Sequence, residues 1–403
     1  MKVLKRVLCL ILVCTILSVS CIYSSADTDD TILNPPGDTA GDTTIDVDAQ
    51  PNLDLSCQAA VLMEASSGTV LYAMNENAEM SPASVTKIMT LLLVMEAIDA
   101  GQIKLTDSVT ISANAASMGG SQVFLEEGEQ RSVEDLVKCT VIASANDAAV
   151  ALSEHLAGSE SAFVERMNER AGELGLTGCH FENPTGLDDD TQNHVLSATD
   201  IAVISRELIR HPLILKYSGV WMDTIRGGEF TLTNTNRLIR FYQGATGLKT
   251  GSTDKAKFCI TATAERNDMT LIAVIMAAPS RDARNTDAKK LFDFGFASYG
   301  VYKDASETCG PVKVCGGVRD AVEGGHADFT QVLPKADLKK VEKQISLQPQ
   351  LSAPIGKGTQ IGTVSYLLNG EVIGTAPITA NDTIPKIGFL QFVGRMLKIY
   401  LLS

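Results

Sequence analysis

Residues 84–101 read SVTKIMTLLLVMEAIDAG, and this stretch indicates both a structure and a chemistry. The residues after Lys87 are apolar nearly all round the helical repeat and stop at a glycine, which predicts a buried helix. Ser84 and Lys87 stand three residues apart at its start, so they share one face of the helix. A serine hydroxyl needs an adjacent base to act as a nucleophile, and a lysine can be that base only if burial or a neighbouring cation lowers its pKa.

Two further triplets follow in the chain, Ser144-Ala145-Asn146 and Lys249-Thr250-Gly251. An S-x-x-K or an S-x-N arises by chance about once or twice in a chain of this length, and a K-T-G about once in ten such chains. In this order the three motifs form the set known from penicillin-binding proteins and class A β-lactamases. The contexts fit as well, because we expect the first motif at a helix start, the second between two helices and the third on a strand.

The rest of the central region alternates between apolar runs and turn signals. Apolar runs at 59–63 and 69–74, separated by Ser66-Ser67-Gly68, predict a β-hairpin. Further helices are expected over 132–156 with a break at the S-x-N triplet, 161–174, 199–210 (ended by Pro212) and 287–299. Further strands are expected over 245–251, 256–264 and 270–278. Strands at both ends with helices between them predict an α+β fold, in which one antiparallel sheet carries an inserted helical subdomain.

The first part of the chain predicts export. Residues 1–26 have a basic start, an apolar run to about Val19 and small residues at 24–26, as in a cleaved signal peptide. The run is short for an uncleaved membrane anchor, and Ser18 disfavours a lipoprotein signal ending at Cys21. Residues 27–54 form an acidic linker expected to be disordered, with seven aspartates and no lysine or arginine over 27–52. Losing the signal takes the net charge from −14 to −17, which argues against nucleic acid as a partner.

The last part of the chain carries a different pattern. Residues 304–382 contain short β-like runs with glycine and proline, which predict a small separate all-β domain. Residues 383–403 combine large apolar residues with Lys386, Arg395 and Lys398 and contain no acid. This pattern predicts an amphipathic helix at a membrane surface. A helix docked on the protein's own core is the alternative.

Cysteine and histidine spacing gives no sign of a metal site. Six cysteines remain after signal removal, and no two of them form a C-x-x-C pair. Only Cys309 and Cys315 are close in sequence, so a bridge across a short hairpin stays open. The five histidines are dispersed, and we expect neither a metal nor a cofactor. The sequence also lacks G-x-S-x-G, which disfavours a Ser-His-Asp hydrolase.

Residues from about 55 to 385 resemble the serine D-alanyl-D-alanine carboxypeptidases, the low-molecular-weight penicillin-binding proteins. The segments that carry the resemblance are PASVTKIMT at 82–90, ANDA at 145–148, NPTGLD at 183–188, GATGLKTG at 244–251 and residues 281–290. The resemblance implies a penicillin-binding/β-lactamase-like transpeptidase fold over 55–303, then the β domain and a membrane-associating helix. It also implies a peptidoglycan pentapeptide as substrate, β-lactam antibiotics as covalent inhibitors and a place at the outer face of the cytoplasmic membrane.

The resemblance further implies four catalytic residues. Ser84 attacks the carbonyl of the penultimate D-alanine, and Lys87 takes its proton. Ser144 passes a proton towards the leaving amine. Asn146 positions Lys87 and the substrate amide.

The substrate-binding residues follow in the same way. The resemblance implies that Lys249, Thr250 and Arg284 face the terminal carboxylate. Gly251 follows Lys249 and Thr250 on the same strand end and belongs to the same binding group, whereas Arg284 comes from the segment 281–290. Cations with a hydroxyl suit this task, because charged hydrogen bonds to a carboxylate are strong. The backbone N–H groups of Ser252 and of the nucleophile are expected to form the oxyanion hole.

Two departures and three alternatives stay open. Ser252 stands where many relatives carry histidine, which leaves the turnover rate open, and Thr235 stands where some carry arginine. A β-lactamase is disfavoured, because no E-x-x-L-N lies between Asn146 and Lys249. A non-catalytic cell-wall-binding protein is disfavoured by the intact motifs. A D,D-endopeptidase that cleaves peptide cross-links remains the nearest chemical alternative.

Overall fold

A computed structural model describes residues 50–402 with the exception of residue 190. The predicted signal peptide, and the predicted linker up to residue 49, lie outside the described residues. The elements of the first region are β1 (Ala59–Glu64), β2 (Val70–Met74), η2 (Ala83–Thr86), α2 (Lys87–Asp99), β3 (Ser108–Thr110), α3 (Ala113–Ala116), β4 (Gln130–Ser132), α4 (Val133–Ile142), α5 (Asn146–Ala157), α6 (Glu160–Glu173), α7 (Ala198–Ile209), α8 (Pro212–Ser218), β5 (Met222–Ile225), η3 (Arg226–Gly228), β6 (Phe230–Thr233), α9 (Leu238–Phe241), β7 (Ala245–Thr253), β8 (Lys257–Arg266), β9 (Met269–Ala278) and α10 (Arg281–Ser298). The remaining elements are β10 (Tyr299–Asp304), β11 (Thr308–Cys315), β12 (Ala321–Gly325), β13 (Phe329–Pro334), η4 (Leu338–Lys340), β14 (Val341–Leu347), β15 (Leu351–Ser352), β16 (Gln360–Leu368), β17 (Glu371–Ala380) and α11 (Phe389–Leu402).

A five-stranded antiparallel sheet organises the first region, in the order β2-β1-β9-β8-β7. Strand β1 pairs with β9, which lies about 200 residues later, so the sheet is built from both ends of the region. The predicted α+β architecture is therefore confirmed. Side chains of β1 alternate between the two faces of the sheet, and both faces are buried because each packs against a core. Ala59, Val61 and Met63 join the core formed with the helices, whereas Ala60 and Leu62 join the core that includes α10.

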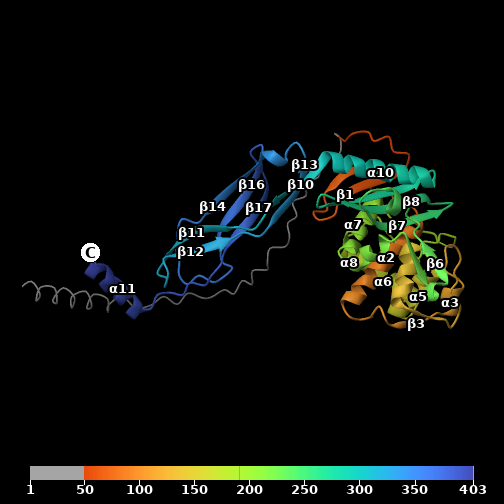
Figure 1. The fold of residues 1–403 in the computed structure, drawn as a ribbon, viewed down its shortest axis with the longest axis horizontal. Coiled ribbons are helices and arrows are strands. Elements are labelled where there is room, and N and C mark those ends of the chain that lie inside the picture. Colours follow the sequence, from red (N-terminus) through yellow and green to blue (C-terminus); the bar gives the residue numbers. More distant parts are fainter. Residues whose placement is uncertain (1–49, 190, 403) are drawn as a thin grey trace, which may run out of the picture. The chain divides into compact units, whose positions relative to one another are not determined.

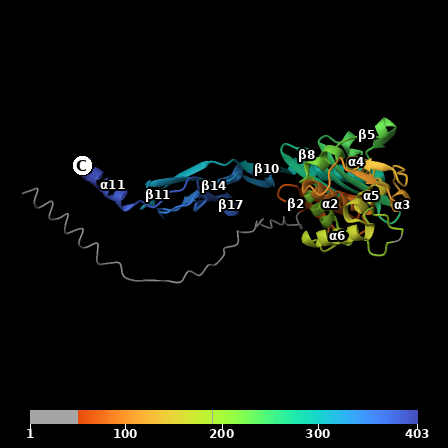
Figure 2. The same cartoon turned by 90° about the horizontal axis from the view of Figure 1, so that it is seen from below.

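Helices cover both faces of this sheet (Figure 1). Helix α10 supplies Ala288, Leu291 and Phe292 to the core on one face. The other face packs against a larger core that draws on α2, α4, α5 and α7. Figure 2 shows α3, α4 and α5 gathered side by side in this helical part. Helix α2, which follows Ser84, is the central member of this helical part and is buried on nearly every side.

Two helix boundaries differ from the sequence prediction. Helix α10 begins at Arg281 rather than at residue 287, because the Ser280 hydroxyl accepts a hydrogen bond from the Ala283 N–H and caps a polar first turn. Pro212 ends the predicted helix but also starts a second one, α8, that the sequence reading missed. Proline is favoured at the first helical position, where its missing N–H costs nothing. The predicted break near Ser144 is confirmed, since α4 ends at Ile142 and α5 begins at Asn146.

The C-terminal region is rich in strands, as expected. Its larger sheet has six strands in the order β14-β16-β17-β12-β11-β15, and β10 pairs with β13. Strand β10, Tyr299–Asp304, spans the boundary that the sequence reading put at 303. Cys309 and Cys315 are both free thiols. They lie at opposite ends of β11, so about 20 Å of extended chain separates them, which is too far for the disulfide that the sequence left open.

The amphipathic helix α11 begins at Phe389, six residues after the expected start of the terminal segment. The residues before it belong to the β region, because Ile384 is fully buried and bridges to Ile355. Within the described residues, no helix has the length and apolarity needed to cross a membrane. Arg395 on α11 forms an ion pair with Asp320, at 2.7 Å between guanidinium nitrogen and carboxylate oxygen.

Candidate active site

The turn that starts the buried helix brings Ser84 and Lys87 together. Lys87 Nζ lies 2.8 Å from Ser84 Oγ, 2.6 Å from Asn146 Oδ1 and 2.7 Å from the Thr185 carbonyl oxygen. The Asn146 and Thr185 oxygens can only accept hydrogen bonds. A neutral amine has two N–H groups and one lone pair, so its two N–H groups donate to those oxygens. The lone pair is then directed at the Ser84 hydroxyl, which is the arrangement that a general base requires.

Burial favours the neutral form of Lys87. The side chain is fully buried, and this loss of solvation lowers its pKa well below the ordinary value. The nearby Lys249 cation lowers the pKa further, while the Asp147 carboxylate opposes both effects. Asp147 also accepts hydrogen bonds from the Val123 and Leu125 N–H groups, which ties the loop after residue 120 to the start of α5.

A second serine–lysine pair lies opposite the first. Ser144 occupies the break between α4 and α5, with a backbone φ of 64° in the left-handed region. Its hydroxyl accepts a hydrogen bond of 2.7 Å from Lys249 Nζ, which also donates to the Thr250 carbonyl at 2.8 Å. Burial, helped by the Arg284 cation, lowers the pKa of Lys249 to about 7. The pair can therefore hold or release a proton near neutral pH.

Close backbone approaches fix the position of the nucleophile. A Cβ at Gly251 would lie 2.9 Å from the backbone nitrogens of Ser84 and Val85, so only glycine lets β7 run beside the η2 turn. On the other side, Gly186 has a φ of 77°, and a Cβ there would meet the Ala83 carbonyl oxygen at 1.9 Å. The expected oxyanion donors, the N–H groups of Ser84 and Ser252, belong to the two segments that meet at Gly251.

These groups surround a cavity of about 150 Å³. It is lined by Ser84, Ser121, Ser144, Thr235, Thr250, Gly251, Ser252, Arg281 and Arg284. Six of the nine site residues expected from the sequence line this cavity. The other three, Lys87, Asn146 and Lys249, lie behind the lining residues. Arg284 is buried and donates to the Asn285 side chain, and burial lowers its pKa only to about 10. It stays cationic at neutral pH, so the cavity suits an anionic group.

The structure separates the three groups expected to face a substrate carboxylate. Thr250 and Arg284 line the cavity, but the ammonium of Lys249 is directed at Ser144. Lys249 thus contacts the hydroxyl of Ser144 and lies behind the residues that line the cavity.

Sequence reasoning missed three contributors. Thr185 acts through its backbone carbonyl, and Ser121 lies on a loop with no motif; its carbonyl accepts a 2.7 Å hydrogen bond from the Asn146 N–H. Thr185 lies in the segment 183–188 that carries the family resemblance, but nothing in the sequence indicates a role for its backbone carbonyl. The contact of Ser121 joins distant segments, which a single sequence does not reveal. Arg281 lies in the segment 281–290 that carries the family resemblance, so a signal was present, but no role was assigned to it.

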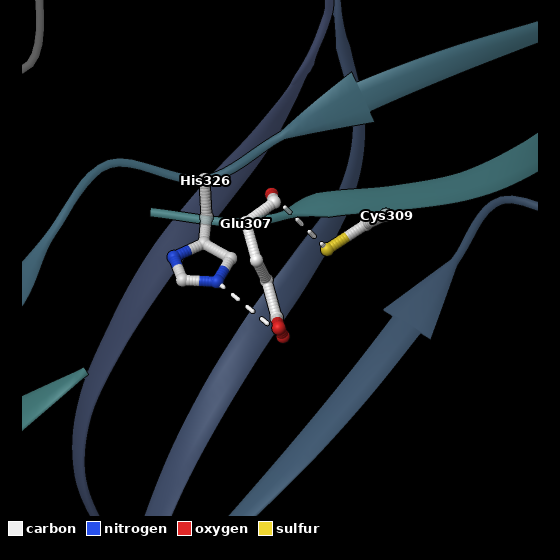
Figure 3. A group of neighbouring side chains, drawn as sticks. All are labelled: Glu307, Cys309 and His326. Carbon is white, nitrogen blue, oxygen red and sulfur yellow. Dashed lines mark hydrogen bonds and ion pairs between the residues drawn. The ribbon is translucent and has the colours of Figure 1, made fainter. Parts of the chain in front are cut away.

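One group of possible metal ligands occurs in the described residues, in the β region. It consists of Glu307, Cys309 and His326 (Figure 3). Lys343 Nζ donates to Glu307 Oε1 at 2.5 Å and lies 3.2 Å from His326 Nε2. The ammonium of Lys343 therefore satisfies two of the three candidate ligands. None of the expected catalytic residues belongs to this group, and the expectation that the chemistry needs no metal stays a prediction.

The sequence and the fold are both similar to those of known proteins. The chain matches the D-alanyl-D-alanine carboxypeptidase family over residues 45–280 and the penicillin-binding protein 5 C-terminal domain over residues 298–386. The carboxypeptidase DacF of Bacillus subtilis is 43% identical and covers 84% of this chain and 89% of its own length. Penicillin-binding protein 5 from Haemophilus influenzae matches with a TM-score of 0.73 and 34% identity, over 84% of this chain and 99% of its own. Penicillin-binding protein D2 from Listeria monocytogenes, solved in an ampicillin-bound form, matches with a TM-score of 0.57 and 33% identity, over 61% of this chain and 100% of its own.

Proposed function

Because the chain belongs to the D-alanyl-D-alanine carboxypeptidase family, we propose that it removes the terminal D-alanine of peptidoglycan stem peptides through an ester formed on Ser84. The main support for this proposal is the contact between Lys87 Nζ and Ser84 Oγ. It places a buried amine with a lowered pKa 2.8 Å from the hydroxyl that would attack. The Asn146 and Thr185 oxygens hold the amine in that orientation.

The proposed reaction has two stages. Ser84 Oγ attacks the carbonyl of the penultimate D-alanine as Lys87 takes the hydroxyl proton, and the N–H groups of Ser84 and Ser252 stabilise the oxyanion. The C–N bond then breaks, and Ser144, in contact with Lys249, delivers a proton to the departing D-alanine. In the second stage the hydroxyl of a water molecule replaces Ser84 on the carbonyl carbon, and the water's remaining proton restores the Ser84 hydroxyl. The proton held by Lys87 passes to the Ser144–Lys249 pair, which had given one to D-alanine.

Arg284 gives a direct test of the proposed function. We predict that Arg284→Ala lowers kcat/KM for D-alanine release from a free D-Ala-D-Ala terminus by about 10- to 150-fold, because a charged hydrogen bond contributes about 1.5–3 kcal/mol. An amidated terminus, which lacks the charge, should lose less than about threefold. Chromatography of released D-alanine from the free terminus, and of D-alaninamide from the amidated one, measures the two rates.

Two controls accompany this measurement. Arg284→Lys keeps the charge and should recover part of the selectivity, and thermal unfolding reports whether the loss of a buried side chain has damaged the fold. Equal losses for free and amidated termini would exclude Arg284 as the carboxylate contact. No D-alanine release by the wild type would exclude the carboxypeptidase itself.

We also propose that β-lactams acylate Ser84 and remain attached. The likeness to a penicillin-binding protein solved with ampicillin supports this step. Among the residues that the structure describes, no aspartate or glutamate lines the cavity. Class A β-lactamases use a glutamate to activate the water that releases the drug. The lack of such a carboxylate at the cavity favours a trapped acyl-enzyme over β-lactamase turnover.

We propose that the enzyme works outside the cytoplasm, held at the membrane by α11, after cleavage of residues 1–26 and with residues 27–54 as a linker. Large apolar side chains on α11 support this, since Phe389, Leu390 and Leu401 are each at least 75% exposed. The proposed order is then a catalytic domain near 55–303, a β domain and the terminal helix. Interfacial binding combines buried apolar area with attraction to anionic lipids.

Removal of α11 tests the anchor. The chain should be shortened after Gly388, because a cut after residue 382 would remove the buried Ile384 from the β core. We predict that the mature protein sediments with anionic vesicles, less at high salt, and that the shortened protein stays in the supernatant with unchanged carboxypeptidase activity. Lys398→Glu should weaken binding by reversing one charge, worth about 1 kcal/mol per basic residue near the surface. If the mature protein stays in the supernatant with such vesicles, α11 is not an anchor.

A further inference from the structure

Three acceptors in the β region converge on one cation, the ammonium of Lys343. Its Nζ lies 2.7 Å from Asp304 Oδ2, 2.5 Å from Glu307 Oε1 and 3.2 Å from His326 Nε2. The acceptors come from the end of β10, from the loop after it and from the residue that follows β12, whereas Lys343 belongs to β14. Segments far apart in the chain therefore build one cage of acceptors around a positive charge.

The sulfur of Cys309 lies beside this cage (Figure 3). The ligand atoms of Cys309, Glu307 and His326 lie within 4.8 Å of one another. Cys309 is 5% exposed and its thiol is free. The thiol donates a long hydrogen bond, 3.8 Å from sulfur to oxygen, to the Glu307 backbone carbonyl. A buried, weakly bonded thiol thus joins an imidazole and two carboxylates.

Further hydrogen bonds orient the imidazole and one carboxylate. His326 Nδ1 lies 2.7 Å from the Ala327 carbonyl oxygen, which can only accept, so Nδ1 carries the hydrogen and Nε2 presents its lone pair to the cage. The His326 side chain is fully buried. Asp304 Oδ2 accepts a 2.7 Å hydrogen bond from the Tyr366 hydroxyl. Histidines and carboxylates that bind metals in proteins are held by such outer hydrogen bonds.

The spacing of these atoms suits a tetrahedral metal ion. Ligand atoms bound to one zinc ion at about 2.0–2.3 Å lie about 3.3–3.8 Å apart. His326 Nε2 lies 3.7 Å from Asp304 Oδ2 and 3.8 Å from Glu307 Oε1. The sulfur needs a movement of about 1 Å at most to join them. A thiolate and an imidazole favour zinc over the oxygen-bound ions magnesium and calcium.

We propose that Cys309, His326, Glu307 and Asp304 bind one Zn²⁺ ion at the position that the Lys343 ammonium holds in this structure. The Cys309 thiol releases its proton to solvent on binding. The three anionic ligands then exceed the charge of the ion by one, and the Lys343 ammonium, whose side chain is 21% exposed, moves outward and balances that charge. The ion ties together β10, β11 and the end of β12, so its role is structural. The sequence predicted no metal because these ligands form no short motif.

Zinc binding to the mature protein tests the proposal. After dialysis against a chelator, calorimetric titration should show one Zn²⁺ per chain with a Kd of about 1 µM or lower. Thermal unfolding should move to higher temperature with Zn²⁺ and not with Mg²⁺, because an ion that binds only the folded chain stabilises it. Co²⁺ in place of Zn²⁺ should give the intense visible bands of a tetrahedral site and a thiolate-to-cobalt charge-transfer band.

Four variants locate the bound ion. Cys309→Ser and His326→Gln should each weaken Zn²⁺ binding at least about 100-fold, since loss of an outer hydrogen-bond partner alone costs about 10–100-fold. Glu307→Gln, at a half-exposed side chain on which the fold does not depend, should weaken binding at least about tenfold. Lys343→Met should strengthen binding about tenfold, because an ammonium no longer competes for the same acceptors.

Cys315→Ser and His155→Gln are the matched controls. Cys315 is a free thiol at the other end of β11, and His155 is exposed on α5, so neither change should alter Zn²⁺ affinity.

Three results would overturn the proposal. The first is a wild type that binds no Zn²⁺ or gives no thiolate-to-cobalt band. The second is unchanged affinity in Glu307→Gln and Cys309→Ser, which would place the ion elsewhere. The third is a Lys343→Met protein that loses stability without gaining affinity, which would make Lys343 the permanent partner of these acceptors. The cobalt spectrum and Glu307→Gln decide the question even if His326→Gln does not fold.

Discussion

Replacing Ser84 by alanine is expected to abolish covalent labelling by penicillin and to lower kcat for D-alanine release by at least about 10⁴-fold. The reason is chemical, because the substitution removes the only atom that can form the ester. Lys87 keeps its two carbonyl partners, Asn146 and Thr185, so the free energy of unfolding should change by no more than about 1 kcal/mol. Mass spectrometry after incubation with penicillin measures the adduct directly.

Ser252→Ala is the matched control for this experiment. Ser252 lines the same cavity, but its proposed contribution is a backbone N–H, which alanine retains. Labelling should therefore persist, with kcat reduced by less than about tenfold, well below the loss of an oxyanion donor. Equal labelling of the wild type and Ser84→Ala would place the nucleophile elsewhere, and loss of labelling in Ser252→Ala would assign that hydroxyl a direct role.

The sequence allowed prediction of those elements whose signal is local. The helix after Ser84 is apolar all round, and strand β1 alternates between two buried faces, so both patterns follow from burial. The order of the S-x-x-K, S-x-N and K-T-G motifs indicated that residues 84–87, 144–146 and 249–251 meet in one site. Ser84 with Lys87 is a contact of one helical turn and could be read from spacing alone.

Contacts between residues that are far apart in the sequence could not be predicted from the sequence alone. The carbonyl of Thr185 completes the surroundings of Lys87, yet any residue type carries a carbonyl. The hairpin of β5 and β6 was missed because each strand has only four residues, too few for the alternation over Phe230–Thr233 to stand out in the sequence. The sequence also did not predict where the Lys249 side chain points, because its orientation depends on how deeply it is buried. Its ammonium contacts Ser144 behind the cavity wall.

Burial of two lysines connects the fold to the chemistry. Lys87 and Lys249 are each at most 1% exposed, and removing a cation from water disfavours its charged form. Each contacts a serine hydroxyl at hydrogen-bonding distance, on the attacking side for Lys87 and on the proposed leaving-group side for Lys249. The apolar helix α2 and the sheet that enclose them thereby lower the pKa of both amines, as the proposed reaction requires of the base Lys87 and of the proton donor Lys249.

Replacing Lys87 by arginine should lower the rate of acylation by penicillin about 10³-fold at pH values above the lowered pKa of Lys87, because a guanidinium cannot deprotonate and a general base contributes about 10²–10⁴-fold. In the wild type, acylation should fall as the pH falls through the lowered pKa of Lys87, since only the neutral amine accepts the Ser84 proton. The variant should lack this acidic limb.

Lys87→Met separates the loss of the base from damage to the fold. Methionine has a similar length and no charge, so it should be equally slow in acylation. Its free energy of unfolding should stay within a few kcal/mol of the wild type, because the cost of burying an ionisable amine is removed while Asn146 Oδ1 and the Thr185 carbonyl lose their donor. Stopped-flow acylation from pH 5 to 9 and thermal unfolding measure the two effects. If Lys87→Arg acylated at a near-normal rate with the same acidic limb, the limb would belong to another group. Lys249 beside Ser144, with its pKa lowered to about 7, would then be the base.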